Sequence, residues 1–545
     1  MTPHGANAFD YVIVGAGSAG CVLAHRLSAS GRHRVLLLEA GGEDRSVWIH
    51  VPLGFGKLFT NPQVNWLYMS EPEPECGDRR IIQPRGKVLG GSSSINGLLY
   101  VRGQAEDYDR WRQLGNPGWS FADVLPYFRK AEDQQRGSSD FHGVNGPLAV
   151  SDTEAHPLCE AFLEAARQAG HVLNDDFNGE TQEGFGYYQV TTRNGRRCST
   201  AVGYLKPARR RANLAVVSNA LATRILFDGR RAAGVAYFQG DQAHTARARA
   251  EVIVAGGAIN SPQLLQLSGL GPASLLRSFG INLIADMPGI GADLQDHYLV
   301  RMAYRCTEPL TLNDIVGSWP RSIVAGLRYG LFRRGILSAG AAVAGGFLRS
   351  DPAVATPDLQ VHIMLFSADA AGGPLHSFSG FSTPVILLRP ESRGHVRIKS
   401  VNPFDPPAIQ PLYLSARKDR DLIVTGLKTL RRIMAAPAIR RYIAEEREPG
   451  LDCTSDVDLL EFARQRGSTV YHPTSTCRMG TDPTAVVDAR LRVHGIDGLR
   501  VVDASIMPAL VSGNTNAAVI MIAEKGADMI LADAAAACRE PRRAY

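Results

Sequence analysis

One imidazole and one carboxamide near the C-terminus are the side chains best suited to chemistry on a substrate. His472 stands between Tyr471 and Pro473, and Asn514 follows in the next segment of the chain. Imidazole titrates close to neutral pH, so His472 can take a proton from a hydroxyl group. A carboxamide cannot act as a base at neutral pH, so Asn514 would orient the hydroxyl or stabilise a developing alkoxide. A lone histidine is more often a structural residue, so this interpretation depends on the rest of the chain.

A glycine-rich loop near the N-terminus predicts a binding site for a dinucleotide. Residues 11–14 are apolar and read as a buried strand, and Gly15, Gly17 and Gly20 follow them. Glu39 closes a second apolar strand, close to the spacing of about 20 residues that the dinucleotide fingerprint expects. The first glycine permits the tight turn, the second lets backbone approach the pyrophosphate, and the third lets the helix pack on the strand. Glu39 would bind the ribose hydroxyls, whereas a purely structural turn is the alternative.

Composition sets the class of protein. A chain of 545 residues is too long for one ordinary core, so two or more domains are expected. The net charge of +6 is small for this length, and the basic cluster at 206–211 reads as a solvated loop rather than a nucleic-acid site. The eight cysteines are scattered without zinc-site spacing, which predicts a reducing compartment and no metal. Residues 1–9 lack signal-peptide features and no long apolar run occurs, so the predicted location is cytoplasmic, without a membrane span.

Hydrophobic patterning predicts two domains of different kinds. Apolar runs that look like buried parallel strands recur late in the chain, at 214–217, 251–255 and 499–502. The region between them alternates at 394–399 and shows helical periodicity at 422–433 and 457–464. The prediction is an α/β protein with a discontinuous Rossmann-like domain and an α+β substrate domain built on an antiparallel sheet. The first would comprise residues 1–155, 190–300 and 465–545, and the second 156–189 and 301–464.

A cationic amphipathic stretch at 321–334 places Ile323, Leu327 and Leu331 on one face. We predict that this face packs within the substrate domain. Contact with the surface of an inner membrane that holds quinone is the alternative.

Four ordered motifs lie between residue 10 and about residue 530. They are the run from Gly86 to Asn96 with Tyr100, Gly103 and Asp109; the run from Gly257 to Gly271; 471–473; and 514–516. Together they resemble the glucose–methanol–choline oxidoreductases, and 476–480 is similar to the choline-dehydrogenase-like alcohol dehydrogenase branch. The resemblance covers nearly the whole chain. It implies FAD as the cofactor and oxidation of an alcohol.

The resemblance also implies which residues contact FAD. They are Gly15, Gly17, Ser18, Ala19, Gly20, Glu39, Ala40, Gly86, Val88, Gly90, Gly91, Ser92, Asn96, Gly97, Ala222, Gly256, Asp503, Ala504 and Asn516. Some family members attach FAD through a histidine just before this asparagine, but Ile95 stands here, so FAD is expected to bind non-covalently. A helix that begins near Asn516 would point its positive N-terminus at the flavin.

The implied reaction is the oxidation of an alcohol to an aldehyde or ketone. His472 would take the hydroxyl proton while hydride passes to flavin N5, with Asn514 beside the oxygen. The apolar character of 301–380 favours a primary aliphatic or aromatic alcohol, and the sequence does not place the carboxylate or aromatic cage that choline would need. A dehydrogenase that passes electrons to a quinone or a redox protein is favoured. The alternatives are an oxidase that uses O2, a flavin-containing lyase, a fatty-acid photodecarboxylase, and a flavin-binding protein without turnover.

Overall fold

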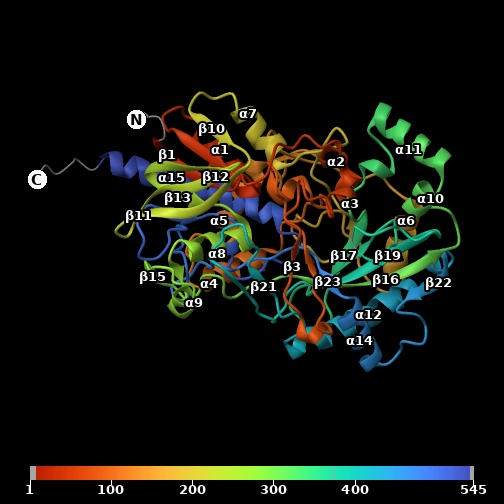
Figure 1. The fold of residues 1–545 in the computed structure, drawn as a ribbon. Helices are drawn as coiled ribbons and strands as arrows, with labels where there is room; N and C mark the ends of the chain where they lie inside the picture. The colour runs from red at the N-terminus through yellow and green to blue at the C-terminus, as the bar shows by residue number, and fades with distance from the viewer. Residues whose placement is uncertain (1–7, 371, 540–545) are drawn as a thin grey trace, which may run out of the picture.

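Two large β-sheets lie beside each other in the protein, one on the left and one on the right of Figure 1. The computed structural model describes residues 8–370 and 372–539. Most of the region considered for a signal peptide, residues 1–7, lies outside the described residues. The first sheet carries the glycine-rich loop, and the second is the antiparallel sheet expected for the substrate side.

The first sheet is a mixed sheet of seven strands in the order β10-β2-β1-β13-β12-β11, with β24 paired to β13. Its strands are β1 (Ala8–Val14), β2 (Val35–Leu38), β10 (Leu214–Val217), β11 (Ala220–Asp228), β12 (Arg231–Gln239), β13 (Gln242–Val254) and β24 (Leu499–Val501). β10, β2, β1, β13 and β24 run parallel, whereas β11 and β12 are antiparallel hairpin strands. The prediction that distant segments return to one sheet is confirmed.

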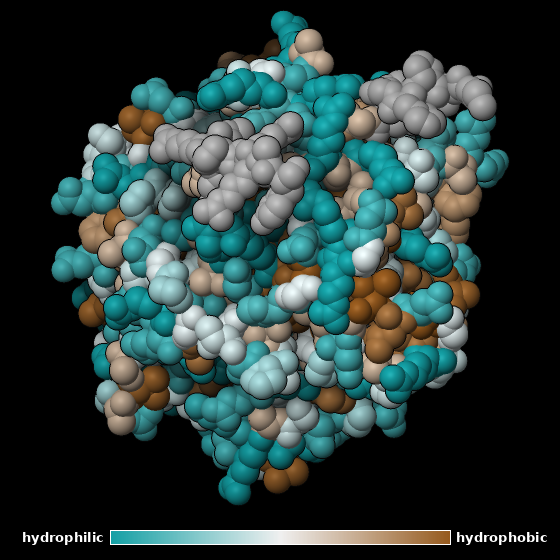
Figure 2. Space-filling model, turned by 90° about the vertical axis from the view of Figure 1, so that its left-hand side faces the viewer, coloured by the Kyte–Doolittle hydropathy of each residue, from teal (hydrophilic) through white to brown (hydrophobic). Residues whose placement is uncertain are grey.

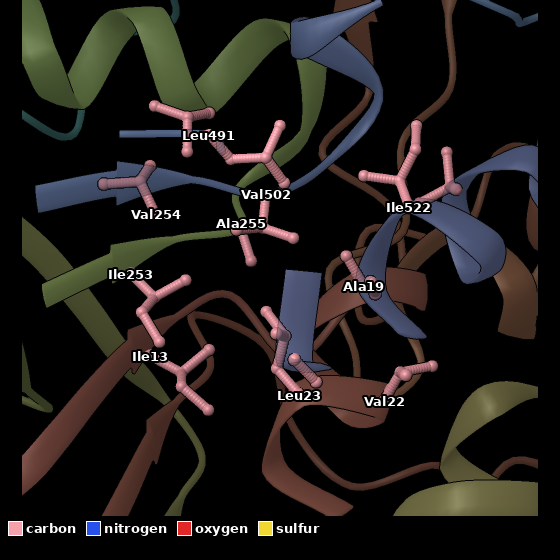
Figure 3. Packing of buried hydrophobic residues seen from close by; sticks show 14 of the residues in the cluster. Ile13, Ala19, Val22, Leu23, Ile253, Val254, Ala255, Leu491, Val502 and Ile522 are labelled. Carbon is pink, nitrogen blue, oxygen red and sulfur yellow. The ribbon is translucent and has the colours of Figure 1, made fainter. Parts of the chain in front are cut away.

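The core of this half forms where two helices pack on the parallel strands. Helix α1 (Ser18–Leu27) follows the glycine-rich loop and packs against α15 (Asn516–Arg539), the last helix of the described chain. Figure 3 shows Ile13 and Ile253 of the strands on the side of Leu23 of α1, and Ile522 of α15 beside Ala19 of α1; all of them belong to one hydrophobic cluster. The four Ile and Leu side chains are buried, and each contributes about 1.5–3 kcal/mol of hydrophobic free energy on burial. This packing fixes the N-termini of both helices relative to the sheet.

The second sheet has seven strands in the order β22-β16-β19-β18-β17-β7, with β23 paired to β16, and every pairing in it is antiparallel. Its strands are β7 (Gly184–Tyr187), β16 (Tyr298–Cys306), β17 (Ala344–Leu348), β18 (Leu359–Ile363), β19 (Gly380–Leu387), β22 (Ile443–Glu448) and β23 (Ser468–Thr469). Three helices, α6 (Pro157–Gln168), α12 (Arg417–Met434) and α14 (Asp456–Arg466), share its hydrophobic core. The helices predicted at 422–433 and 457–464 are therefore present, and each extends beyond the predicted residues at both ends.

The strand limits differ from the predicted domain limits at two places. The limit at 300 falls inside β16, and β23 joins the substrate sheet although it lies beyond 464. The stretch at 394–399 does form an antiparallel strand, β20 (His395–Arg397), but it pairs with β21 (Ala408–Gln410) in a separate sheet. Val396 of β20 packs against Ile259 of α8 (Gly257–Leu267), so this small sheet belongs beside the first large sheet.

The predicted packing of the 321–334 face within the substrate domain is wrong. This stretch forms α11 (Trp319–Phe332), which projects from the edge of the molecule at the upper right of Figure 1. Ile323, Leu327 and Leu331 are all exposed. Among residues 8–370 and 372–539, no helix combines the length and the apolar character needed to cross a bilayer.

Candidate active site

A cavity of about 950 Å³ connects the glycine-rich loop to the His472 segment. One end is lined by Val14 and Leu38, at the carboxyl ends of β1 and β2, where parallel sheets commonly bind ligands. The other end is lined by residues of the antiparallel sheet, including Arg301 of β16 and His362 of β18. The two ends therefore come from the two sheets.

Most residues predicted to bind the cofactor line this cavity. They are Gly15, Gly17, Ser18, Ala19, Glu39, Ala40, Gly86, Gly91, Ser92, Asn96, Gly97, Ala222, Gly256, Asp503, Ala504 and Asn516. Gly20, Val88 and Gly90 do not line it. Val88 is fully buried, and the Gly90 N–H donates to the Ala16 carbonyl at 2.8 Å, so these residues support the wall from behind.

The glycines form a cradle that side chains would fill. A Cβ atom on Gly20 would lie 1.8 Å from the carbonyl oxygen of Gly15. Gly91 has φ +52°, and its Cβ would lie 2.6 Å from Cα of Gly17. A Cβ on Gly17 would meet nothing within 4 Å, because this position faces the open cavity. The space along Gly17 and Gly91 fits an extended ligand that touches backbone, such as a dinucleotide.

Glu39 holds the loop as well as facing the cavity. Its two carboxylate oxygens accept from the N–H groups of Ala16 and Gly41, each at 2.8 Å. Burial raises the pKa of this carboxyl to about 7. These two hydrogen bonds would explain a buried carboxylate at this turn even without a ligand. The carboxylate oxygens of Glu39 keep further lone pairs that can accept from ribose hydroxyls.

Asp503 and Asn516 join separate segments at the cavity wall. Asp503 accepts from the Gly257 N–H at 2.8 Å and from the Ser261 hydroxyl at 2.5 Å. Asn516 begins α15, and its side-chain oxygen accepts from the Ser18 hydroxyl at 2.7 Å. The N-terminus of α15 thus borders the cavity, where its dipole favours negative charge. The described residues fit FAD at this end.

The predicted catalytic pair is brought together at the other end of the cavity. Nδ2 of Asn514 lies 3.3 Å from Nε2 of His472, and both residues line the cavity. Oδ1 of Asn514 is buried and has no hydrogen-bond partner. Burial, with a smaller contribution from His297, lowers the pKa of His472 well below its usual value. His472 is therefore neutral at pH 7 and free to accept a proton.

A second histidine, His297, determines which nitrogen of His472 carries the proton. Nε2 of His297 lies 3.0 Å from the carbonyl oxygen of Leu388, which can only accept, so this nitrogen carries hydrogen. Burial lowers the pKa of His297 to about 4, so its Nδ1 holds a lone pair. That Nδ1 lies 3.0 Å from Nδ1 of His472, which must donate. The lone pair of His472 is therefore on Nε2, toward Asn514 and the cavity.

Three neighbours hold the backbone at His472. Asp296 accepts the His472 N–H at 2.8 Å, and Arg85 donates to the carbonyl of Tyr471 at 2.5 Å. Tyr471 has φ +69°, a left-handed conformation that costs a non-glycine residue about 1–3 kcal/mol. Pro473 restricts His472 from the other side. The position of the imidazole is thus set by the surrounding structure rather than by a regular helix or strand.

Aromatic and basic side chains surround the substrate end. Phe55 contacts Phe59 and Phe366 at ring-centroid distances of 6.0 and 6.5 Å, and Phe59 contacts Tyr471 at 5.1 Å. Arg301 lines the same end. The described cavity lining contains carboxylates only at Glu39 and Asp503, both at the cofactor end.

His362 also faces this end. Its Nε2 is buried without a partner, and burial lowers its pKa to about 3, so it is neutral. A neutral imidazole can donate to or accept from a polar group of the substrate.

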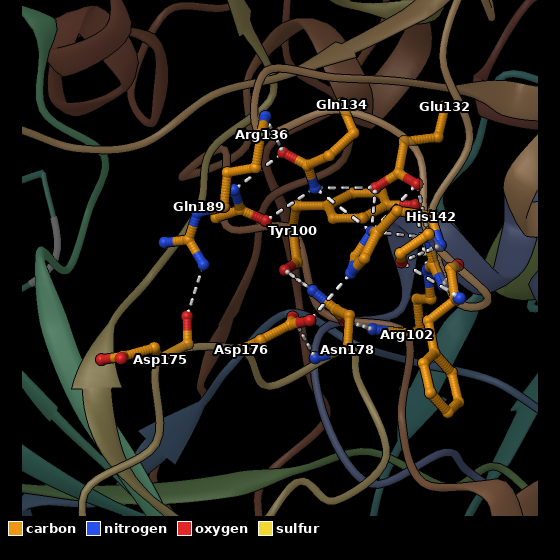
Figure 4. Close-up of polar contacts among 12 residues, drawn as sticks. Tyr100, Arg102, Glu132, Gln134, Arg136, His142, Asp175, Asp176, Asn178 and Gln189 are labelled. Atoms are coloured by element: carbon orange, nitrogen blue, oxygen red, sulfur yellow. Dashed lines mark hydrogen bonds and ion pairs between the residues drawn. The ribbon is translucent and has the colours of Figure 1, made fainter.

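A separate group of buried polar residues lies away from the cavity (Figure 4). Arg102 pairs with Glu132 at 2.7 Å, and His142 lies between Glu132 and Asp176 at 3.0 and 2.9 Å. The hydrogen bonds to Asp176 and Glu132 outweigh burial and raise the pKa of His142 to about 8. Each charge has a partner, so this network holds loops together.

Comparison with known proteins identifies the family. Models described as GMC oxidoreductase match residues 9–299 and 390–523. The chain belongs to the GMC oxidoreductase family. It is 46% identical over 528 residues to the oxygen-dependent choline dehydrogenase of Burkholderia vietnamiensis (strain G4 / LMG 22486), covering 96% of this chain and 93% of that protein. It is 43% identical over 527 residues to alcohol dehydrogenase (acceptor) of Pseudomonas putida, covering 96% of each.

Solved structures agree with this assignment. Pyridoxine 4-oxidase from Mesorbium loti matches with a TM-score of 0.87 and 31% identity, over 95% of this chain and 98% of that one. The predicted α/β fold and the oxidoreductase activity on CH–OH donors are confirmed, and FAD is the cofactor of the family.

Sequence reasoning missed His297 and His362. His297 follows Asp296 at the start of β16, and no motif singled it out. His362 lies on β18, where it and Gln360 alternate with apolar residues, so the pattern predicted a polar face without singling out the histidine.

Proposed function

We propose that this GMC oxidoreductase oxidises an uncharged, largely apolar primary alcohol to the aldehyde, with His472 as the base. The observation that carries the proposal is the His472–Asn514 pair, which faces a cavity end rich in aromatic side chains. The same geometry admits a secondary alcohol, which would give a ketone.

The residues at this end can activate a hydroxyl group. The hydroxyl oxygen accepts from Nδ2 of Asn514 and donates its proton to Nε2 of His472. As the proton moves, negative charge builds on the oxygen, and Asn514 stabilises it. His472 becomes imidazolium and keeps its Nδ1–H directed at His297. FAD, when bound, supplies the acceptor for the hydride that leaves the alcohol carbon.

The charge of the cavity argues against choline as the preferred substrate. A trimethylammonium group needs a carboxylate or an electron-rich aromatic cage. The described lining at the substrate end offers aromatic rings but no carboxylate, and it carries Arg301 and Arg85, whose positive charges would repel a trimethylammonium group. Phenylalanine rings there favour an apolar aliphatic or aromatic chain. We therefore propose that this chain differs in substrate from the choline dehydrogenases that it resembles.

FAD is proposed to bind without a covalent bond. Ile95 lines the cavity beside Asn96 and carries no nucleophilic atom. Acid precipitation should release all of the flavin into the supernatant. Flavin that stays with the precipitated protein would contradict this.

We also propose a dehydrogenase that passes electrons to a quinone or a redox protein. Similarity to an alcohol dehydrogenase named for an acceptor supports this. The alternative is an oxidase that passes the electrons to O2.

The seven cysteines whose side chains are described are free thiols, which supports a cytoplasmic location as part of the proposal.

The first test is anaerobic flavin reduction by the purified holoenzyme. Benzyl alcohol and 1-octanol should bleach the visible absorbance of the oxidised flavin, and choline should do so far more slowly. His472→Ala should slow bleaching by about 10²–10⁴-fold while FAD stays bound. His244→Ala, a partly exposed histidine on β13 outside the cavity, is the control and should not change the rate. Equal rates in both variants would refute the role of His472.

Slow return of colour in air, made fast by a quinone, is expected of a dehydrogenase.

A further inference from the structure

Helix α11 turns its apolar side away from the protein. Its least exposed positions are Ser322, Ala325 and Tyr329, and Tyr329 anchors it by donating to the Gly195 carbonyl at 3.0 Å. The opposite side carries an apolar stripe at helical spacing that begins in the preceding helix α10 (Leu312–Val316). Its members and their exposures are Val316 60%, Trp319 79%, Ile323 41%, Val324 65%, Leu327 59% and Leu331 73%.

Such a stripe is unusual for a helix on a protein surface. A surface helix normally buries its apolar side against the core, and a large contiguous exposed patch marks an interaction site. The opposite end of the molecule shows the normal arrangement, with hydrophobic residues in small groups among hydrophilic ones (Figure 2). The α11 stripe therefore needs an external partner.

The charged residues within the segment that carries the stripe, from 315 to 350, are all positive. No Asp or Glu occurs between Asp314 and Asp351, whereas this segment carries Arg321, Arg328, Arg333, Arg334 and Arg349. Arg328 faces Glu154 at 3.3 Å across an exposed ion pair. Arg321 and Arg334 are exposed near the two ends of α11, and no ion pair holds either of them in the described structure. The stripe is thus flanked by cations that point to an anionic partner.

A second copy of the chain fits this surface poorly. In a two-fold contact the same patch meets itself, so the arginines of one copy would lie against those of the other. Like charges at close range oppose such a contact. An anionic lipid surface offers apolar chains for the stripe and negative headgroups for the arginines at once.

We propose that α10 and α11 dock the protein on the surface of an anionic phospholipid bilayer. The stripe enters the boundary between headgroups and acyl chains, and Arg321 and Arg334 contact the lipid headgroups. This geometry is that of a helix lying in the interface rather than crossing the membrane.

Docking would bring the cavity rim to the lipid. Leu312, Asn313 and Val316 of α10 line the cavity, and Val316 also belongs to the exposed stripe. An alcohol dissolved in the bilayer could therefore enter the cavity without crossing water. This second step rests on the function proposed above, whereas docking itself does not.

Flotation of the holoenzyme with vesicles tests docking without any turnover. Vesicles of phosphatidylglycerol and phosphatidylcholine should carry the protein upward, and vesicles of phosphatidylcholine alone should carry much less. The double variant Leu327→Glu/Leu331→Glu should lower the partition coefficient by roughly tenfold or more. Arg321→Gln/Arg334→Gln should lower it by roughly fivefold per arginine and reduce its salt dependence.

The control changes two equally exposed apolar residues elsewhere. Leu451→Glu/Val457→Glu should float like the wild type; Leu451 precedes α14 and Val457 lies in its first turn. Quenching of Trp319 fluorescence by brominated lipid, lost in Trp319→Phe, would locate the contact. Failure of the wild type to float with the anionic vesicles would overturn the proposal. So would a concentration-dependent dimer that Leu327→Glu/Leu331→Glu abolishes, because the stripe would then be a protein interface.

Steady-state kinetics test separately whether the alcohol enters the cavity directly from the bilayer, which is called delivery here. The double variant should lower kcat/KM for 1-hexadecanol held in anionic vesicles and leave kcat/KM for water-soluble benzyl alcohol unchanged. Equal loss on both alcohols would refute delivery even if docking holds. No flavin reduction with any alcohol in the wild type would refute the proposed function instead and leave the flotation result standing.

Discussion

Replacing His297 should slow catalysis although this residue does not touch the substrate. Nδ1 of His297 is the acceptor for Nδ1–H of His472, at 3.0 Å. His297→Leu removes that acceptor and leaves a buried N–H without a partner, which costs about 1–3 kcal/mol. His472 can avoid this cost by moving its proton to Nε2. In that tautomer Nε2 can no longer accept the hydroxyl proton.

The magnitude follows from the cost of the orphaned N–H. A preference of 1–3 kcal/mol for the wrong tautomer corresponds to about 5–150-fold. The limiting rate of flavin reduction by a saturating alcohol should fall by that factor. Stopped-flow mixing under anaerobic conditions measures it directly, and the FAD content of each preparation must match that of the wild type.

His297→Asn is the matched comparison. Its side-chain oxygen takes the place of Nδ1 and can accept from His472, while the contact with the Leu388 carbonyl is lost as it is in His297→Leu. The two variants therefore differ mainly in the acceptor that they offer to His472. The asparagine variant should recover most of the lost rate. Equal rates in the two variants, or a leucine variant as fast as the wild type, would refute the tautomer argument.

Three further predictions concern pH, the cofactor and the substrate. Burial, with His297 second, lowers the pKa of His472, so the neutral base persists as pH falls from 7. The acid limb of the kcat/KM profile should therefore lie below pH 6.5, and a midpoint above 7 would contradict this. Gly91→Ala should lose FAD, because the added Cβ would lie 2.6 Å from Cα of Gly17 at a left-handed φ; flavin per protein after gel filtration measures it. Arg301→Glu should raise kcat/KM for choline by about tenfold or more and lower it for apolar alcohols, measured side by side.

Local motifs were the predictable part of this protein. The glycine-rich loop and its two strands follow from short-range patterns, since each residue acts through its own backbone position. The start of α15 was expected from the family resemblance. Gly20 illustrates the limit. A side chain there would meet the Gly15 carbonyl, as its predicted packing role requires, but Gly20 does not line the cavity, where the resemblance had placed it.

The parts that failed depend on long-range contacts. The periodicity of α11 correctly indicated a helix with an apolar face, yet it could not say whether anything covers that face. His297 carried no local signal at all, because its partner His472 is distant in the sequence. Periodicity reports which side of an element is apolar, and only the fold reports what lies opposite.

The pairing of β16 with β23 explains how two distant histidines meet. Tyr298 pairs with Thr469, and the N–H of Val470 donates to the carbonyl of His297 at 3.0 Å. This short antiparallel ladder sets His297 directly beside the turn that carries His472. A slip of one residue would exchange the faces of the strand and turn His297 away from the imidazole. The antiparallel sheet therefore does more than line one end of the cavity: its register sets the tautomer of His472, the proposed base, while the parallel sheet supplies the place for the cofactor.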